Sequence, residues 1–433
     1  MLTALGRAFR TPDLRRKLLF TLGIIVLVRL GSFVPTPGVD YAAVQQCIAQ
    51  AETGNSLLGL VNLFSGGALL QLSVFALGIM PYITASIIVQ LLTVVIPRFE
   101  ELKKEGQAGT SKLTQYTRYL TIALAVLQST TYVSIARDPV RLFQVDCAQV
   151  VPDQSLPTIA LMVLTMTAGT GLIMWLGENI TERGVGNGMS LLIFTQIAAT
   201  FPTSLWAIGR EQGWVTFAGI LAIGLVVVAA VVAVEQSQRR VPVQYAKRMV
   251  GRRVYGGSST YIPLKVNMAG VIPIIFASSL LYLPALVSQF AADQNAGWVL
   301  WINEHFTRGD HPVYMAVYFL LIIFFAFFYV AITFNPDEVA ENMRKYGGFI
   351  PGVRAGRPTA EYLDYILTRI TLPGSLYLGL ISLLPLIAFV AFNANQNFPF
   401  GGTSILIIVG VGLETVKQIE SQLQQRNYEG FLR

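Results

Sequence analysis

The sequence predicts an all-α polytopic membrane protein with ten transmembrane helices, arranged in two inverted pseudo-symmetric halves of five, plus a re-entrant half-helix. Of the 433 residues, 53% are apolar and only 13% are charged, and the mean hydropathy is +0.57. Soluble domains carry about 25% charged residues, so this composition indicates a membrane protein. Charge-poor stretches long enough to cross about 30 Å of hydrocarbon recur along the chain. They are 18–34, 72–95, 119–136, 154–177, 189–207, 212–234, 266–292, 312–336 and two within 370–413.

One uncharged run, 53–97, extends over 45 residues without Asp, Glu, Lys, Arg or His. A span needs about 20 apolar residues, and 72–95 supplies one. The segment 59–70 is left over, and its Gly, Ser and Asn residues predict a short, broken half-helix. Irregular backbone at membrane depth is tolerated only where protein buries it or where it lines a water-filled cavity. The run therefore predicts a channel or a transport path.

The second half of the chain contains a similar uncharged run. Residues 370–413 include 44 positions without a charged side chain, interrupted by Pro373 and Gly374 and by three Asn residues. Such a similarity favours an inverted repeat, which places a transport path at the interface of its halves. The alternative is that unrelated spans and linkers happen to lack charge. We divide the chain into an arm (1–17), a first half (18–207), a second half (208–424) and a tail (425–433).

The basic residues predict the orientation. Lys and Arg concentrate in cytoplasmic loops, and placing the N-terminus inside puts 26 of the 31 basic residues on that side. We therefore expect both termini to be cytoplasmic. The first span has no small-residue cleavage site, so we expect it to be retained.

The two cysteines, Cys47 and Cys147, both fall in external loops of this topology, where disulfides persist. Two isolated cysteines give no spacing pattern that would indicate a bridge. Two free thiols are therefore the expectation, and a disulfide is the alternative.

Two cytoplasmic loops suggest partner contacts. The loop 236–265 has no acid, which suits a polyanionic partner or anionic lipid headgroups. The loop 335–369 balances its charges, but Arg354 lies in a segment rich in Gly and Pro, so it is either a specific protein contact or simply solvated. The basic residues of the first loop are Arg239, Arg240, Lys247, Arg248, Arg252, Arg253 and Lys265.

Two further segments receive no functional assignment. The stretch 184–188 superficially resembles a phosphate-binding loop, but no Lys follows it, so we expect a turn in which Asn187 caps the next helix. The loop 98–112 is expected to be a solvated turn.

Catalysis finds no support in the sequence. His305 and His311 have no Glu or Cys pattern that would make a zinc site, and neither a nucleophile motif nor a carboxylate pair within a span is present. The spans are also uncharged apart from Arg29, which we expect to snorkel or pair locally, whereas coupled transporters usually bury ionisable groups. An apolar constriction can gate a pore by dewetting, and Ile79 and Ile83 are placed to contribute.

Long, ordered motifs extend over the chain, and together they resemble the bacterial SecY family, the central subunits of the Sec protein-conducting channel. The motifs are 33–38 (FVPTPG), 64–67 (FSGG), 75–86 (FALGIMPYITAS), 115–118 (QYTR), 180–188 (ITERGVGNG), 251–255 (GRRVY), 263–273 (PLKVNMAGVIP), 346–352 (YGGFIPG) and 401–404 (GGTS).

The resemblance implies an hourglass pore in the cytoplasmic (inner) membrane, with no cofactor. It would pass unfolded secretory polypeptides and release transmembrane segments sideways into lipid; the alternative is a secondary transporter of a small solute. A sixth ring position falls on Gly410, where either the seal is looser or Met189 or Ile197 fills the gap. The other ring positions are Ile79, Ile83, Ile193, Ile275 and Ile407.

The resemblance also implies a plug and a lateral gate. The plug is the half-helix 59–70, hinged at Gly66 and Gly67. The gate lies between the second and third spans and the seventh and eighth, where Gln90 and Asn267 would pair at about 1 kcal/mol. The remaining plug positions are Asn62, Phe64 and Ser65.

The partners implied are small SecE-type and SecG-type membrane subunits, the SecA motor ATPase, the ribosome with its rRNA and proteins, signal sequences and nascent polypeptides, and anionic lipids. SecA or the ribosome would supply the energy. The docking residues implied are Arg239, Arg240, Arg252 and Arg253 in the basic loop, and Arg354 and Arg357 in the following one.

Overall fold

The computed structural model describes most of the chain. The described residues are 9, 11–50, 65–139, 143, 147–211, 213–245, 248–250, 253–255, 259–289, 296–306, 311–392 and 402–429.

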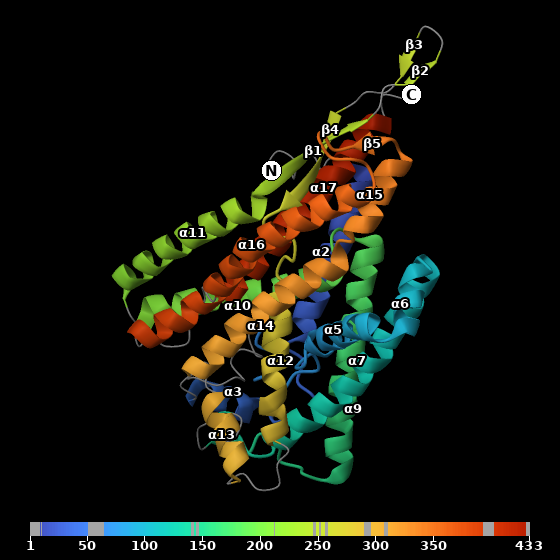
Figure 1. Cartoon of the computed structure of the whole chain (residues 1–433). Coiled ribbons are helices and arrows are strands. Elements are labelled where there is room, and N and C mark those ends of the chain that lie inside the picture. Colours follow the sequence, from blue (N-terminus) through green and yellow to red (C-terminus); the bar gives the residue numbers. More distant parts are fainter. Residues whose placement is uncertain are drawn as a thin grey trace.

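The described part of the chain is a bundle of long helices with a small group of strands at one end (Figure 1). Two shorter helices, α3 and α13, lie at the opposite end. The helices are α2 (Pro12–Gly31), α3 (Tyr41–Gln50), α5 (Met80–Val95), α6 (Pro97–Lys104), α7 (Gln107–Ala136), α9 (Leu156–Arg183), α10 (Gly188–Glu211), α11 (Trp214–Gln236), α12 (Ile272–Gln289), α13 (Gly297–His305), α14 (Pro312–Thr333), α15 (Pro336–Lys345), α16 (Arg357–Phe392) and α17 (Gly402–Glu429). The strands are β1 (Gln238–Tyr245), β2 (Arg248–Val250), β3 (Arg253–Tyr255), β4 (Ser259–Lys265) and β5 (Gly348–Phe349).

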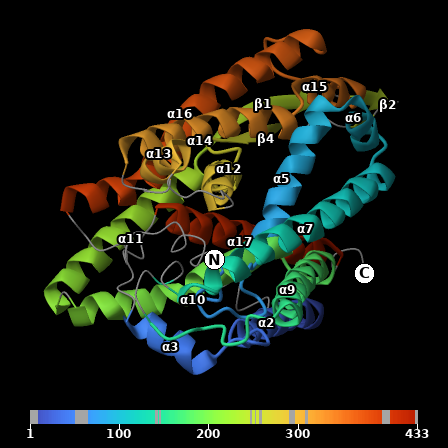
Figure 2. The same cartoon turned by 90° about the horizontal axis from the view of Figure 1, so that it is seen from below.

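Seen from the end that carries α3 and α13, the helices fall into two groups (Figure 2). Helices α2, α7 and α9 lie on one side and α12, α14 and α16 on the other, with α5 between them. Helix α5 contacts both α7 and α12, and α10 contacts α17. Four helices, α5, α10, α12 and α17, therefore reach the middle of the molecule.

The helices agree with the predicted membrane class. Each of the ten charge-poor stretches overlaps a helix, and among the described residues five helices are long and apolar enough to cross a membrane. The number becomes six if α5 and α6, which are bent by 100°, form one broken span. Shorter apolar helices cover Gly188–Pro202 and Ile272–Leu281.

Helix α5 is shorter than the span 72–95 that the sequence predicts. It begins at Met80, because Gly78 adopts a positive φ of 56° and Pro81 is tolerated only in a first turn. Its 16 residues extend about 24 Å at 1.5 Å per residue, less than the hydrocarbon thickness. Residues 72–79 are turns apart from Ser73, which bridges Pro35, so the expectation of a continuous helix was wrong there.

The loop 98–112 was also predicted incorrectly. Instead of a solvated turn, α6 covers Pro97–Lys104, and α7 begins at Gln107. Gly106, with a φ of 75°, joins the two. The charged residues that suggested a loop occupy an exposed helix face, where Lys104 and Glu100 form an i,i+4 ion pair at 2.7 Å.

The basic loop is a β-structure rather than an irregular loop, so the fold is mostly helical but not purely so. Strands β1 and β4 pair antiparallel, with Gln238 opposite Lys265, and β5 pairs with the other edge of β1. Strands β2 and β3 form a separate pair. The buried residues Val241, Val243 and Leu264 fix the first sheet to α14 and α16. We call strands β1 to β4 the basic arm.

A disulfide joins Cys47 on α3 to Cys147, so the expectation of two free thiols was wrong. Their Cα atoms are 5.6 Å apart, although 100 positions separate them in the sequence. Packing brings them together: the Asp40 amide donates to the Val150 carbonyl at 2.9 Å, and Cys47 lies in the same buried cluster as Val150. Sequence spacing could not reveal this contact.

Candidate functional site

The segment 65–79 crosses the interior as turns and is largely buried. Several of its backbone groups form hydrogen bonds with the segment that follows α2. The amide and the hydroxyl of Thr36 donate to the Leu72 carbonyl at 3.0 and 2.7 Å, and the Val74 amide donates to the Val34 carbonyl at 2.9 Å. Irregular backbone inside a membrane requires such internal partners.

Only part of the predicted plug is described. Residues 65–70 are turns rather than a half-helix, while Asn62 and Phe64 lie outside the described residues. Ser65 is buried, and its hydroxyl accepts from the Leu69 amide at 3.1 Å. Gly66 and Gly67 have φ values of 67° and 90°, a conformation that favours glycine.

Arg29 pairs locally with the ring of Phe33, as the sequence suggests, and also reaches a partner far away in the chain. Its Nη1 donates to the Gly66 carbonyl at 2.6 Å, and the guanidinium lies 4.9 Å from the centre of the Phe33 ring. A side chain at position 66 would meet Arg29, because an added Cβ would lie 3.0 Å from Nη1 and 3.3 Å from the Gln196 Cα. The one charge noted within the first span thus holds the start of the segment 65–79.

The five predicted ring isoleucines belong to one larger cluster of apolar side chains, which we call the isoleucine cluster after them. Ile79, Ile193, Ile275 and Ile407 are buried, with exposed fractions from 1% to 9%, and the partly buried Ile83 packs against them. They come from four segments far apart in the chain: the start of α5, α10, α12 and α17. The fold therefore gathers into one apolar cluster the side chains that the resemblance selected.

Gly410 adjoins a residue that the sequence analysis did not consider. A Cβ at Gly410 would lie 3.0 Å from Cγ2 of Val271, which precedes α12. Met189 and Ile197, named as candidates to fill the gap, also belong to the isoleucine cluster. Val271, however, is the side chain directly against the glycine.

Gln196 on α10 is a buried polar residue that the sequence analysis missed. It is only 2% exposed, and neither atom of its amide has a hydrogen-bond partner among the described residues. A Cβ at Gly78 would lie 3.5 Å from its Oε1. Because the residue is neutral, counting charges along the spans could not detect it.

The predicted pairing of Gln90 with Asn267 was wrong. Gln90 donates to the Ser86 hydroxyl, one turn earlier on α5, at 3.3 Å. Asn267 precedes α12 and donates to Oε1 of Glu235 at 2.6 Å and to the Gly270 carbonyl at 3.1 Å. Each amide has other hydrogen-bond partners, so neither needs the other.

The predicted docking residues lie on the basic arm and on the start of α16. Arg239 and Arg240 are exposed on β1, and the Arg240 guanidinium lies 4.8 Å from the centre of the Tyr261 ring. Arg354 is exposed before α16, and the Arg357 Nε donates to Glu361 at 3.0 Å. Arg253 belongs to β3, and Arg252 lies outside the described residues.

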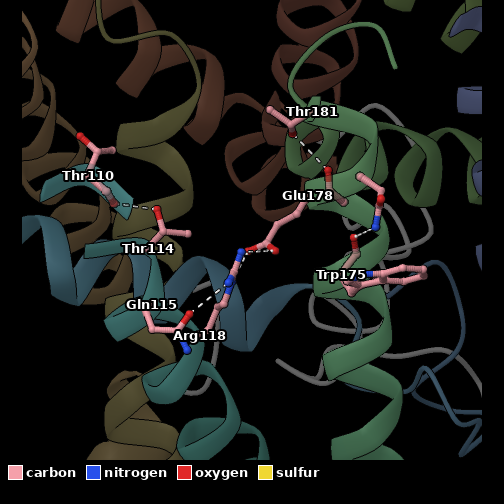
Figure 3. A network of polar contacts seen from close by, with 9 residues as sticks. Thr110, Thr114, Gln115, Arg118, Trp175, Glu178 and Thr181 are labelled. Carbon is pink, nitrogen blue, oxygen red and sulfur yellow. Dashed lines mark hydrogen bonds and ion pairs between the residues drawn. The ribbon is translucent and has the colours of Figure 1, made fainter. Parts of the chain in front are cut away.

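An ion pair between α7 and α9 was not foreseen, because the spans were taken to begin at Tyr119 and to end at Gly177. Arg118 donates from Nε and Nη2 to the two carboxylate oxygens of Glu178 at 2.9 and 2.8 Å, and from Nη1 to Gln115 at 3.0 Å (Figure 3). Bidentate pairs of this kind restrict the relative orientation of the two groups in addition to contributing interaction energy. This one fixes the two helices against each other.

Asn187 caps α10, as predicted. Its Oδ1 accepts from the amides of Met189 and Ser190 at 3.1 and 3.3 Å, and Gly186 supplies a positive φ of 88°. The turn therefore orients the helix that carries Ile193.

Comparisons with known proteins agree with this geometry. The chain is 70% identical to the protein translocase subunit SecY of Streptomyces galbus and 59% identical to that of Mycobacterium tuberculosis, and each match covers 100% of both chains. Among solved structures, a protein-conducting channel has a TM-score of 0.62 at 17% identity, covering 94% of this chain and 91% of that one. Sec61 in a canine ribosome-channel complex has a TM-score of 0.59 at 17% identity, with the same coverage.

These structural matches establish a shared fold, and the sequence matches establish kinship. The SecY family model matches residues 73–416. The chain belongs to the SecY family.

Proposed function

We propose that this chain is a passive protein-conducting channel, which moves unfolded secretory polypeptides across a membrane and releases apolar segments sideways into lipid. The observation that carries the proposal is the isoleucine cluster. Four distant segments contribute bulky apolar side chains to this one cluster, which also includes side chains of the buried turns 65–79. An apolar constriction excludes water and ions until a polypeptide displaces it.

The finer architecture belongs to the same proposal. Ten spans would form two inverted halves, with the plug hinged at Gly66 and Gly67 and the lateral gate between α5 with α7 and α12 with α14. Both termini would face the cytoplasm, as the basic residues suggest. In support, Leu14 at the start of α2 and Ile419 of α17 belong to the same small buried cluster, so the first and last described helices meet.

The proposed cytoplasmic partners follow from the positive charge of the basic arm. The basic arm would bind the ribosome or a SecA-type motor, with anionic lipids nearby, and small SecE-type and SecG-type subunits would brace the bundle. The energy would come from the motor or the ribosome, and the chain itself would not be an enzyme. One structural relative was observed in a ribosome-channel complex, which supports a ribosome as a partner.

Reconstitution tests the function. The chain, co-purified with its small subunits, is placed in vesicles with SecA, ATP and a precursor that carries a signal sequence. We expect the precursor to become protected from external protease only when ATP is present. Accumulation of a small solute against a gradient without partners, with no protection of the precursor, would instead indicate a transporter.

Reversing the charge of Arg354 is expected to abolish SecA-driven export. Its exposed side chain lies in a turn bounded by Gly352 and Gly356, both with positive φ, where a partner can reach it. The measurement is export by Arg354→Glu in the vesicle assay. Arg344→Glu, an equal charge change on the exposed face of α15, is the control and should export normally. Normal export by Arg354→Glu would remove Arg354 from the docking site.

Replacing Arg29 by Met is expected to increase ion leak through the resting channel. The change removes the hydrogen bond from Nη1 to the Gly66 carbonyl, and a bond to a charged group contributes about 1.5–3 kcal/mol. The measurement is conductance in planar bilayers. Arg137→Met, at an exposed site where the guanidinium bonds to Gln154, is the control. An unchanged leak in Arg29→Met would show that this bond does not hold the plug.

A further inference from the structure

Asn267 forms a buried junction between the basic arm and α12. It is 4% exposed, five residues before the helix begins. Its Nδ2 donates to the Glu235 carboxylate at 2.6 Å and to the Gly270 carbonyl at 3.1 Å. A buried polar group is costly without such partners. The position of Asn267 is therefore tied to Glu235, near the end of α11.

The backbone at this junction is held from two further directions. The Val266 amide donates to the Ser237 carbonyl at 3.1 Å, which extends the β1–β4 pairing beyond Gln238 and Lys265. On α16, a Cβ at Gly374 would collide with the Val266 carbonyl, so the helix packs directly on this peptide. The junction is consequently attached to the base of the arm.

The other end of the junction leads into the proposed channel. Gly270 turns the chain with a φ of 62°, and Val271, the next residue, lies against Gly410. One turn into α12, Ile275 enters the isoleucine cluster. Fewer than ten residues thus connect the last strand of the basic arm to the apolar constriction.

We propose that Glu235 is a positioning residue that couples the basic arm to α12 through its hydrogen bond with Asn267. This proposal rests on the proposed channel function. When a partner moves the arm, the Glu235–Asn267 contact makes α12 follow, and Ile275 shifts in the cluster. Such coupling requires an element whose position both sites bias, and the start of α12 meets that condition.

Spin-label distances test the coupling. Labels are placed at Leu127 on α7 and Leu280 on α12, both exposed, and Cys47 and Cys147 do not react because they are bonded to each other. In vesicles, SecA is expected to change the distance between the labels in the parent chain. Glu235→Gln keeps an acceptor oxygen and should keep the change. Glu235→Ala should lose it, because loss of a bond to a charged group weakens the coupling roughly tenfold.

A double-mutant cycle separates coupling from a general structural defect. SecA binding and thermal unfolding are measured for Glu235→Ala, Asn267→Ala and the double variant. We expect SecA still to bind, and the double variant to have no larger effect on the distance than either single change, since each removes the same contact. Additive effects, or an undiminished distance change in Glu235→Ala, would overturn the proposal. An equal loss in Glu235→Gln would also overturn it.

The same preparations distinguish this inference from the proposed function. If the labelled parent chain fails to translocate a precursor with SecA and ATP, the channel function fails. If the parent translocates and Glu235→Ala keeps the distance change, only the coupling role of Glu235 fails.

Discussion

Replacing Ile275 by Asn is expected to make the resting channel leak ions and accept precursors with defective signal sequences. Ile275 is buried in the isoleucine cluster, where the surrounding side chains are apolar and would offer an Asn amide no hydrogen-bond partner. An unsatisfied buried amide costs about 1–3 kcal/mol, so water entry becomes favourable and the leak rises roughly tenfold. Bilayer conductance and export of a precursor lacking a functional signal sequence are the measurements.

Two variants control for effects of size and of polarity alone. Ile275→Val keeps the site apolar and should stay tight. Ile223→Asn places the same amide on the exposed face of α11, away from the cluster, and should not leak. Equal conductance in Ile275→Asn and the parent would exclude this cluster as the seal, and a scaffolding role would then fit better.

Removing the disulfide should cause the largest loss of stability. In the chain-entropy model, a bridge that closes about 100 residues contributes about 4–5 kcal/mol. The double variant Cys47→Ser, Cys147→Ser should therefore unfold at a lower temperature in detergent. Thermal unfolding followed by circular dichroism is the measurement.

Reductant supplies the matched control for this prediction. It should destabilise the parent chain towards the level of the double variant and leave the variant unchanged. If the parent and the double variant unfolded at the same temperature, the packing of α3 against Val150 would be sufficient without the bridge.

The sequence was most informative where apolar character decides the structure. Hydrocarbon length and charge located a helix in every predicted stretch, and family motifs identified isoleucines that the fold gathers into one cluster. The conformation of a single residue was less predictable. Gly78, with its positive φ, delays α5 until Met80 although the residues around it are apolar enough to continue the helix.

Polar partners were the least predictable, because they depend on which segments meet in three dimensions. Arg29 bonds to a carbonyl 37 positions away, and Asn267 to a carboxylate 32 positions away. The strands of the basic arm were not predicted either, because the seven basic residues of this segment indicated a charged loop. The alternation of buried Val241 and Val243 with exposed neighbours was the signal that could have predicted β1.

The disulfide also bears on how the protein is made. Cys47 follows α2, and Cys147 follows α7, so the bond encloses α5, α6 and α7. It can close only after these three helices have been synthesised and the end of α7 has reached α3. Formation of the bond in a pulse-labelled chain would therefore time the insertion of the first part of the bundle, and an unbridged chain would mark a stalled assembly intermediate.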